Sequence, residues 1–322
     1  MVIANQIMQP MVATSGNMVV PRFGHSSTLL QDGRVLIAGG QSKAEDSIFP
    51  NQSTYLSSLE IFDPVTETFT LSNATLTSPR SNQAAVLMGN GQVLFIGGGA
   101  SADMETYDPV TDVCTWRNTI GGILLSGTIA YDIGNNQVLI YGRNNVWLTE
   151  AIIINTSSWT ELPISFYTPL YTAVSQASCI LQDGRIMVSG GSPVGPPNFD
   201  PDGAAIFTAG VSQNVISIFD PATQQFTVVG HMLQARTGHT MLDLGNGTVE
   251  IYGGYLDTPG VQTGSVTFIP GPVTPLSSVE IFNYASTVSS IPLNTSIHIG
   301  NLIGGKYYMN SAIRKNILNS GT

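Results

Sequence analysis

The feature that most constrains this chain is a fixed distance between an arginine and a pair of glycines. In three places an arginine stands seventeen residues before a Gly-Gly pair, at Arg22, Arg80 and Arg236. In the same three copies, the residue fourteen positions before the pair is His25, Gln83 and His239. Such a spacing, repeated at irregular intervals, indicates one structural unit that is used several times with its length variation confined to loops.

Each unit reads as two tight hairpins. In the first copy, apolar segments flank Asp32-Gly33, a dipeptide that accepts the positive φ angles of a two-residue hairpin turn. The second half of this copy, residues 59–69, contains Asp63-Pro64, which suits a type I turn. Similar turns recur along the chain, at Asn90-Gly91, Asp108-Pro109, Asp183-Gly184, Asp220-Pro221 and Asn246-Gly247. Four antiparallel strands per unit, named a to d in chain order, form one propeller blade.

These motifs together resemble the kelch repeat. Arg-x-Gly-His, Asp-Gly, Gly-Gly and the Asp-Pro turn follow one another in the first copy, and five copies cover residues 21–293. The third copy is the weakest, because it has Tyr141-Gly142 in place of the glycine pair. The resemblance implies an all-β fold: a kelch-type β-propeller of the galactose-oxidase-like central domain superfamily, forming a single domain over residues 1–322.

The two termini are expected to complete the ring. Residues 1–20 and 294–322 together hold enough strand-like sequence for a sixth four-stranded blade, which would remove exposed strand edges. Residues 7–14 would supply its d strand, and Gly304-Gly305 its first turn. We therefore expect six blades, and the alternative is five blades with loose termini.

Composition excludes several classes of function. The formal net charge is -10, so the surface would repel a nucleic-acid backbone. The first 21 residues carry no Lys or Arg and fail as a secretory signal, and no stretch is apolar enough to span a membrane. We expect a protein made in the cytosol, and its many Ser, Thr and Asn residues suit a virion or an extracellular assembly.

The two cysteines, Cys114 and Cys179, are expected to be small buried residues that do not form a disulfide.

Long connections point to a working surface. The b-to-c connections at 41–58, 192–214 and 255–277 are long, and strand alternation places all three on one face. The candidate partner-binding residues of this face are Phe49, Tyr55, Phe199, Tyr255 and Asp257, with Arg22, Arg80 and Arg236 at its rim. Two alternatives stay open: the rings could pack their own loops onto the propeller, and each arginine could hold the neighbouring blade through backbone carbonyls.

No motif indicates a cofactor or a catalytic centre. Asn198, Asp200 and Asp202 resemble the opening half of a calcium loop, but Ala209 stands where such a loop needs its glutamate, so a turn is favoured over a metal site. Galactose oxidase, an enzyme on a kelch-type propeller, needs a copper ion held by Tyr and His and a Tyr-Cys crosslink. No such set is recognisable in this sequence, and we expect neither a cofactor nor enzymatic activity.

Three functions remain in order of preference. The leading hypothesis is a non-catalytic binding module that contacts a protein or a glycan with the face of the b-to-c loops. The alternative is a structural subunit of a larger particle, such as a virion or tail component. A galactose-oxidase-like enzyme ranks third.

Overall fold

The computed structural model describes most of the repeat region of the chain. The described residues are 16–43, 53–98, 103–120, 128–143, 149–162, 173–174, 176–193, 198–199, 205–206, 212–257, 261–263, 267–269 and 273–285. Over these ranges the regular structure consists of strands, and none of it is a helix long and apolar enough to cross a membrane. The prediction of an all-β chain is confirmed.

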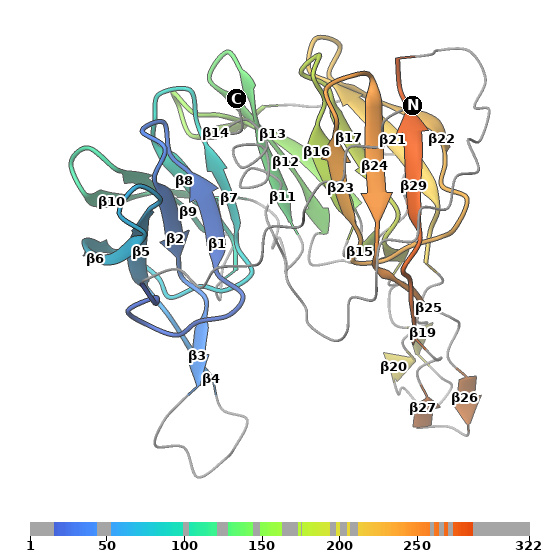
Figure 1. Ribbon diagram of the computed structural model, residues 1–322, viewed down its shortest axis with the longest axis horizontal. Helices are drawn as coiled ribbons and strands as arrows, with labels where there is room; N and C mark the ends of the chain where they lie inside the picture. The colour runs from blue at the N-terminus through green and yellow to red at the C-terminus, as the bar shows by residue number, and fades with distance from the viewer. Residues whose placement is uncertain are drawn as a thin grey trace, which may run out of the picture.

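Five antiparallel sheets, called blades 1 to 5, follow one another in chain order (Figure 1). Blade 1 consists of β1 (Ser26–Leu29), β2 (Val35–Ala38), β5 (Ser58–Asp63) and β6 (Thr68–Thr75). Blade 2 consists of β7 (Ala84–Leu87), β8 (Val93–Ile96), β9 (Asp103–Asp108) and β10 (Val113–Thr119). Blade 3 consists of β11 (Ile129–Gly134), β12 (Gln137–Arg143), β13 (Thr149–Asn155) and β14 (Thr160–Leu162).

The last two blades repeat this pattern. Blade 4 consists of β16 (Ala177–Ile180), β17 (Ile186–Ser189), β21 (Val215–Asp220) and β22 (Gln225–His231). Blade 5 shows three strands, β23 (Thr240–Asp243), β24 (Thr248–Tyr252) and β29 (Val279–Asn283), and its expected d strand lies outside the described residues. Sheets of this kind, arranged side by side, are consistent with a β-propeller.

Local turn chemistry accounts for the hairpins. Gly33 has a φ of 88°, and the Asp32 carboxylate accepts the backbone N–H of Arg34 at 3.0 Å. The Asp63 carboxylate likewise accepts the backbone N–H of Val65 at 2.8 Å, as expected for an Asp that opens a turn. Both turns of the unit therefore form where the sequence predicts them.

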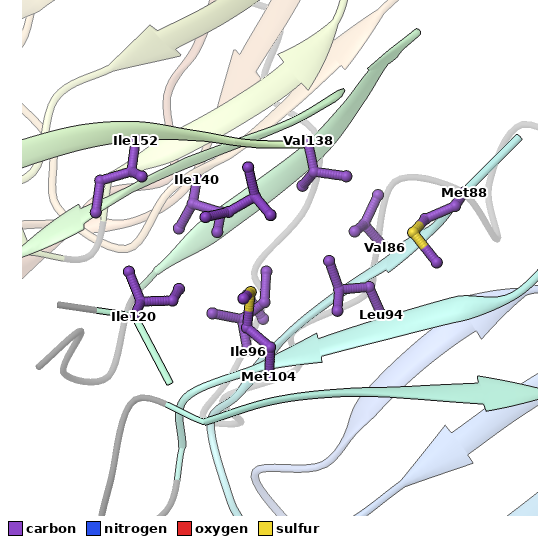
Figure 2. Packing of buried hydrophobic residues seen from close by; sticks show 11 residues of the cluster. Val86, Met88, Leu94, Ile96, Met104, Ile120, Val138, Ile140 and Ile152 are labelled. Carbon is purple, nitrogen blue, oxygen red and sulfur yellow. The ribbon is translucent and has the colours of Figure 1, made fainter. Parts of the chain in front are cut away.

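The core of the molecule lies between blades. Four clusters of buried apolar side chains each join two consecutive blades, from blades 1 and 2 to blades 4 and 5. Figure 2 shows the cluster between blades 2 and 3, where Leu94, Ile96 and Met104 face Val138 and Ile140. These five side chains are at most 1% exposed, so blade-to-blade packing supplies the main hydrophobic stabilisation.

Five two-stranded ribbons extend from the blades. They are β3 (Gln41–Lys43) with β4 (Ser53–Tyr55), β15 (Ala173–Val174) with β18 (Ser192–Pro193), β19 (Asn198–Phe199) with β20 (Ala205–Ile206), β25 (Tyr255–Asp257) with β28 (Val273–Pro275), and β26 (Val261–Thr263) with β27 (Thr267–Ile269). The labelled ribbon strands all lie on one side of the blades, the lower side in Figure 1. We call this side the ribbon face, and the opposite side, which carries the a-to-b and c-to-d turns, the turn face.

Candidate binding surface

The ribbon face is built by the long b-to-c connections of blades 1, 4 and 5. Strand β15 lies in a d-to-a connection and pairs with β18 in a b-to-c connection, so both kinds of connection emerge on the same side. This agrees with the face predicted from strand alternation. The ribbons are therefore extensions of the blades rather than unpaired loops.

An exposed aromatic row crosses the ribbon of blade 1. Gln41 pairs with Phe23 on one side and with Tyr55 on the other, so the three residues lie side by side across three strands. Side chains of directly paired residues project from the same face of a sheet. Phe23 is 57% exposed and Tyr55 is 50% exposed, even though both lie on paired backbone. We call these three residues the aromatic row.

Blade 5 has a related but more buried arrangement. Tyr255 pairs with Thr237 on one side and with Pro275 on the other. Thr237 is 1% exposed, and its hydroxyl lies 2.8 Å from the Ser212 hydroxyl. The Ser212 hydroxyl also accepts the backbone N–H of Asp257 at 2.8 Å. Here Thr237 and Ser212 are buried and bond to each other, whereas Phe23 and Tyr55 of the aromatic row are at least half exposed.

The other predicted loop residues are placed only in part. Asn198 and Phe199 lie on β19, whose backbone pairs with β20. Phe49, Asp200 and Asp202 lie outside the described residues. Of the predicted aromatic contacts, the structure therefore gives an exposed side chain to Tyr55 and a half-buried one to Tyr255.

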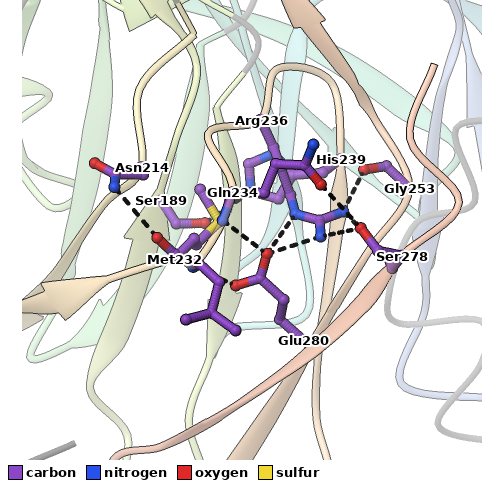
Figure 3. A network of polar contacts seen from close by, with 10 residues as sticks. Ser189, Asn214, Met232, Gln234, Arg236, His239, Gly253, Ser278 and Glu280 are labelled. Carbon is purple, nitrogen blue, oxygen red and sulfur yellow. Dashed lines mark hydrogen bonds and ion pairs between the residues drawn. The ribbon is translucent and has the colours of Figure 1, made fainter. Parts of the chain in front are cut away.

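Arg236 does not face a partner but is completely buried. Its guanidinium pairs with the Glu280 carboxylate at 2.8 Å and donates to the carbonyl oxygens of Gly253 and Ser278, each at 2.9 Å (Figure 3). The same Glu280 carboxylate accepts the backbone N–H of Leu233 at 2.6 Å. This network lies within blade 5 and leaves no guanidinium surface for a ligand.

Arg22 and Arg80 occupy the same position in their own blades. Arg22 pairs with Glu60 at 2.7 Å and Arg80 pairs with Glu105 at 2.6 Å, and all four side chains are at most 1% exposed. The predicted contact of these arginines with a partner is therefore corrected, because all three guanidinium groups are buried. Their side chains hold carbonyl groups of their own blade, not of the neighbouring one, and we leave them out of the binding surface. The glutamates were missed because their distance from the arginine varies with loop length.

The histidine position of the repeat is also structural. His239 Nε2 lies 2.8 Å from the Ser189 hydroxyl of blade 4, while Nδ1 is buried without a partner. Burial, followed by the nearby Arg236 charge, lowers the pKa of His239 to about 3. The imidazole is thus neutral at ordinary pH. Gln83 takes the equivalent place in blade 2 and donates to the Ala38 carbonyl at 2.7 Å.

A hollow that was not predicted from the sequence lies on the turn face. It has a volume of about 350 Å³ and is lined by Arg34, Asp63, Tyr107 and Asp112 among others. The Ser72 hydroxyl donates to Asp112 at 2.5 Å and Tyr107 donates to it at 3.0 Å, which lowers the pKa of this carboxyl. Because these polar groups bond to one another, we interpret the hollow as part of the contact between blades 1 and 2.

Two solved structures are similar to this chain. YjhT superposes with a TM-score of 0.57 at 11% sequence identity, covering 81% of this chain and 81% of its own. A fungal alcohol oxidase of the AA5 family, in complex with copper, superposes with a TM-score of 0.58 at 17% identity. That match covers 85% of this chain and 54% of the oxidase, so the chain spans about half of the oxidase's length. No protein-family model and no curated protein matches the sequence.

These likenesses, together with the four-stranded antiparallel sheets, support a β-propeller fold. They also contradict the expectation that the chain is not an enzyme, since a copper alcohol oxidase is built on a similar fold. The expectation failed because it relied on linear motifs, whereas catalytic residues on such a scaffold come from loops of different blades. Enzymatic activity is therefore open to test.

A copper ion would need several nitrogen, sulfur or oxygen ligands that converge on one point. Within the described ranges, no group of three or more His, Cys, Asp and Glu side chains is placed to hold a metal ion. His239 directs one ring nitrogen to Ser189, and Cys179 is buried in the core between blades 4 and 5. The described His, Cys, Asp and Glu side chains thus do not by themselves form a copper centre.

Proposed function

We propose that this chain is a six-bladed, kelch-type β-propeller that binds a protein or glycan partner through its ribbon face. The observation that carries the proposal is the aromatic row, Phe23, Gln41 and Tyr55. Two rings that are at least half exposed and lie on neighbouring paired strands offer a partner a small apolar surface.

The chemistry of the row suits an uncharged partner. Phe and Tyr rings present flat apolar faces, and the partly buried Gln41 between them is polar but uncharged. Aromatic rings with a few polar groups are typical of the contact regions of protein and ligand sites. None of the three side chains is charged, and the net charge of -10 disfavours a polyanionic partner.

The test combines a glycan array with affinity capture and mass spectrometry. We expect the Phe23→Ala/Tyr55→Ala double variant to lose at least about tenfold in affinity for the captured partner, since interface aromatics often each contribute more than 1 kcal/mol. The matched control is Val65→Ala/Val110→Ala, which removes two side chains that are 90% and 91% exposed on the turn face. Equal loss in both variants, or no loss in the first, would overturn the assignment of the face.

A structural subunit of a larger particle is the alternative role. The free chain has a mass of 34.1 kDa, so sedimentation of the native material distinguishes a free protein from a large assembly. Recovery in a megadalton fraction would favour the subunit, and the aromatic row would then be an assembly contact. Material near the mass of one chain supports the binding role.

The fold likeness to an alcohol oxidase calls for an activity measurement on the same preparation. The wild-type protein is incubated with copper and assayed for dioxygen consumption in the presence of primary alcohols, including sugars. Turnover that depends on added copper would assign an oxidase function and replace the binding proposal. Affinity for a glycan without dioxygen consumption supports binding.

A further inference from the structure

The sequence contains two Asn-Gly dipeptides, and both lie in the turn between the a and b strands of a blade. Asn90-Gly91 connects β7 with β8 in blade 2, and Asn246-Gly247 connects β23 with β24 in blade 5. In such a dipeptide the backbone nitrogen of the glycine can attack the side-chain carbonyl carbon of the asparagine, because glycine has no Cβ to hinder the approach. The two turns are therefore two copies of one reactive pair.

In both turns the asparagine side chain folds back over the peptide bond that contains the attacking nitrogen. The Asn90 side-chain oxygen accepts the backbone N–H of Gln92 at 3.0 Å, and the Asn246 side-chain oxygen accepts that of Thr248 at 3.1 Å. A bond from the side chain to the N–H two residues further on closes an Asx-turn. The closed ring of atoms includes the side-chain carbonyl carbon and the glycine nitrogen, so both turns hold the reacting atoms together.

The glycine N–H is bonded in blade 2 but not in blade 5. Gly91 donates its N–H to the Met88 carbonyl at 2.9 Å, as Gly33 and Gly184 do to the residue three positions before them, at 3.1 and 2.9 Å. The N–H of Gly247 has no hydrogen-bond partner among the described residues. A bonded N–H must first give up its acceptor before the nitrogen can attack, and this costs free energy. Gly247 is thus the more available nucleophile.

The preceding glycine explains why two similar turns differ. Both turns read Gly-Asn-Gly, but Gly245 has a φ of 74°, whereas Gly89 is not among the residues with a positive φ. The N–H of Gly89 donates to Asp132 of blade 3 at 2.6 Å, and that of Gly245 donates to Asp243 of its own blade at 3.0 Å. The neighbouring blade therefore sets the shape of the blade 2 turn, and the blade 5 turn follows another path.

The side-chain carbonyl of Asn246 is also the more activated of the two. Its oxygen accepts the Thr248 hydroxyl at 2.5 Å in addition to the Thr248 N–H. Gln92 stands at the corresponding place in blade 2 and offers only its backbone N–H to Asn90. When the glycine nitrogen attacks, negative charge develops on this oxygen, and two donors already in place stabilise it more than one does.

We propose that Asn246 is a site of spontaneous deamidation and that the fold protects Asn90 from the same reaction. The Gly247 nitrogen forms a bond to the Asn246 side-chain carbon, and the amide group leaves as ammonia together with the Gly247 N–H proton. Water, which reaches this exposed residue, then opens the five-membered succinimide at either carbonyl. The product is aspartate or isoaspartate at position 246, and no reactant other than water is needed.

The turn that reacts also anchors the end of β29. The Gly247 carbonyl accepts the N–H groups of Tyr284 and Ala285, at 2.9 and 3.3 Å. An isoaspartate at position 246 adds one carbon atom to the backbone just before this carbonyl, and either product adds a negative charge three residues after Asp243. The reaction therefore alters a contact between strands of blade 5 and not a free loop.

Peptide mapping of the aged, full-length protein is the primary test. Trypsin places the two asparagines in different peptides, because Arg117 and Arg236 lie between them. After incubation of the folded protein at mildly alkaline pH, fragment masses should show that Asn246 converts at least about tenfold faster than Asn90. In urea, where the turns are lost, the two rates should become similar. Equal rates in the folded protein, or a difference that persists in urea, would overturn the proposal.

The chemical identity of the product tests which atom attacks. A succinimide opens to a mixture of isoaspartate and aspartate, so isoaspartate at position 246 supports attack by the Gly247 nitrogen. Aspartate alone means that water hydrolyses the side chain directly, and this result contradicts the proposed step.

One substitution tests the contribution of the hydroxyl. Thr248→Val removes the hydroxyl and keeps the branched shape, so conversion of Asn246 should slow several-fold. The matched change Gln92→Thr adds a hydroxyl to the blade 2 turn but should leave Asn90 slow, because the Gly91 N–H stays bonded. An unchanged rate in Thr248→Val, or rapid conversion of Asn90 in Gln92→Thr, contradicts the assigned roles. None of these readouts involves a partner, so their failure is distinct from failure of the binding proposal.

Discussion

The buried arginine of blade 1 and the aromatic row lie close together in the sequence but differ completely in their exposure to solvent. Arg22 is the residue before Phe23, yet the guanidinium side chain is completely buried in an ion pair while the next ring is 57% exposed. The arginine recurs in blades 1, 2 and 5, where it forms the same buried ion pair with a glutamate of its own blade, which we call the brace. The aromatic residue does not recur, since Ser81 and Thr237 take its place in blades 2 and 5. Repetition thus marks the scaffold, and departure from it marks the candidate surface.

The sharpest way to test this contrast is to break a brace. Glu105→Gln should lower the free energy of unfolding by about 3–5 kcal/mol, because it leaves the buried Arg80 charge uncompensated. The matched control is Asp32→Asn, which breaks an ion pair whose Asp side chain is 48% exposed, and should cost about 0–1 kcal/mol. Urea unfolding of the two variants measures both effects. Similar losses would show that burial does not distinguish the pairs.

The second prediction concerns pH. His239 takes up a proton near pH 6.5 in the unfolded chain but only near pH 3 in the folded one. Unfolding is therefore coupled to proton uptake between these values, and stability should fall as the pH drops below 6.5, by an amount on the order of several kcal/mol at pH 3. His239→Gln, which copies Gln83 of blade 2, should be less sensitive to acid over this range. Chemical unfolding at several pH values checks the difference, and parallel curves for both proteins would contradict it.

The sequence was sufficient for the scaffold because its turns are local. Asp32 with Gly33 and Asp63 with Pro64 specify hairpins within a few residues, so strand order and blade boundaries could be predicted. The arginine braces could not, because Glu60 lies 38 residues after Arg22 and Glu280 lies 44 residues after Arg236. Nor does a linear pattern show that Gln41 aligns Phe23 with Tyr55, since the pairing crosses a ribbon of variable length.

The third prediction separates the two ribbons. Tyr255 is partly buried against Gly238, whose Cβ would lie 3.1 Å from the ring, whereas Tyr55 is half exposed. Tyr255→Ala should therefore cost about 1–2 kcal/mol of unfolding free energy, and Tyr55→Ala within about 0.5 kcal/mol. Thermal unfolding of each variant without ligand provides the measurement. A larger loss for Tyr55→Ala would mean that its ring packs the ribbon down and is not held ready for a partner.

The smallest expected effect is chemical and concerns the blade interiors. Burial raises the pKa of the Cys114 and Cys179 thiols to about 12, so neither forms an appreciable amount of the reactive thiolate at neutral pH. The native protein should react slowly with a thiol reagent, and both residues should react once urea unfolds the blades. Cys179 is 3% exposed and Cys114 is partly exposed, so Cys114 should be the faster of the two in the native state. Rapid native labelling of Cys179 would show that the buried cluster between blades 4 and 5 opens readily in the folded protein.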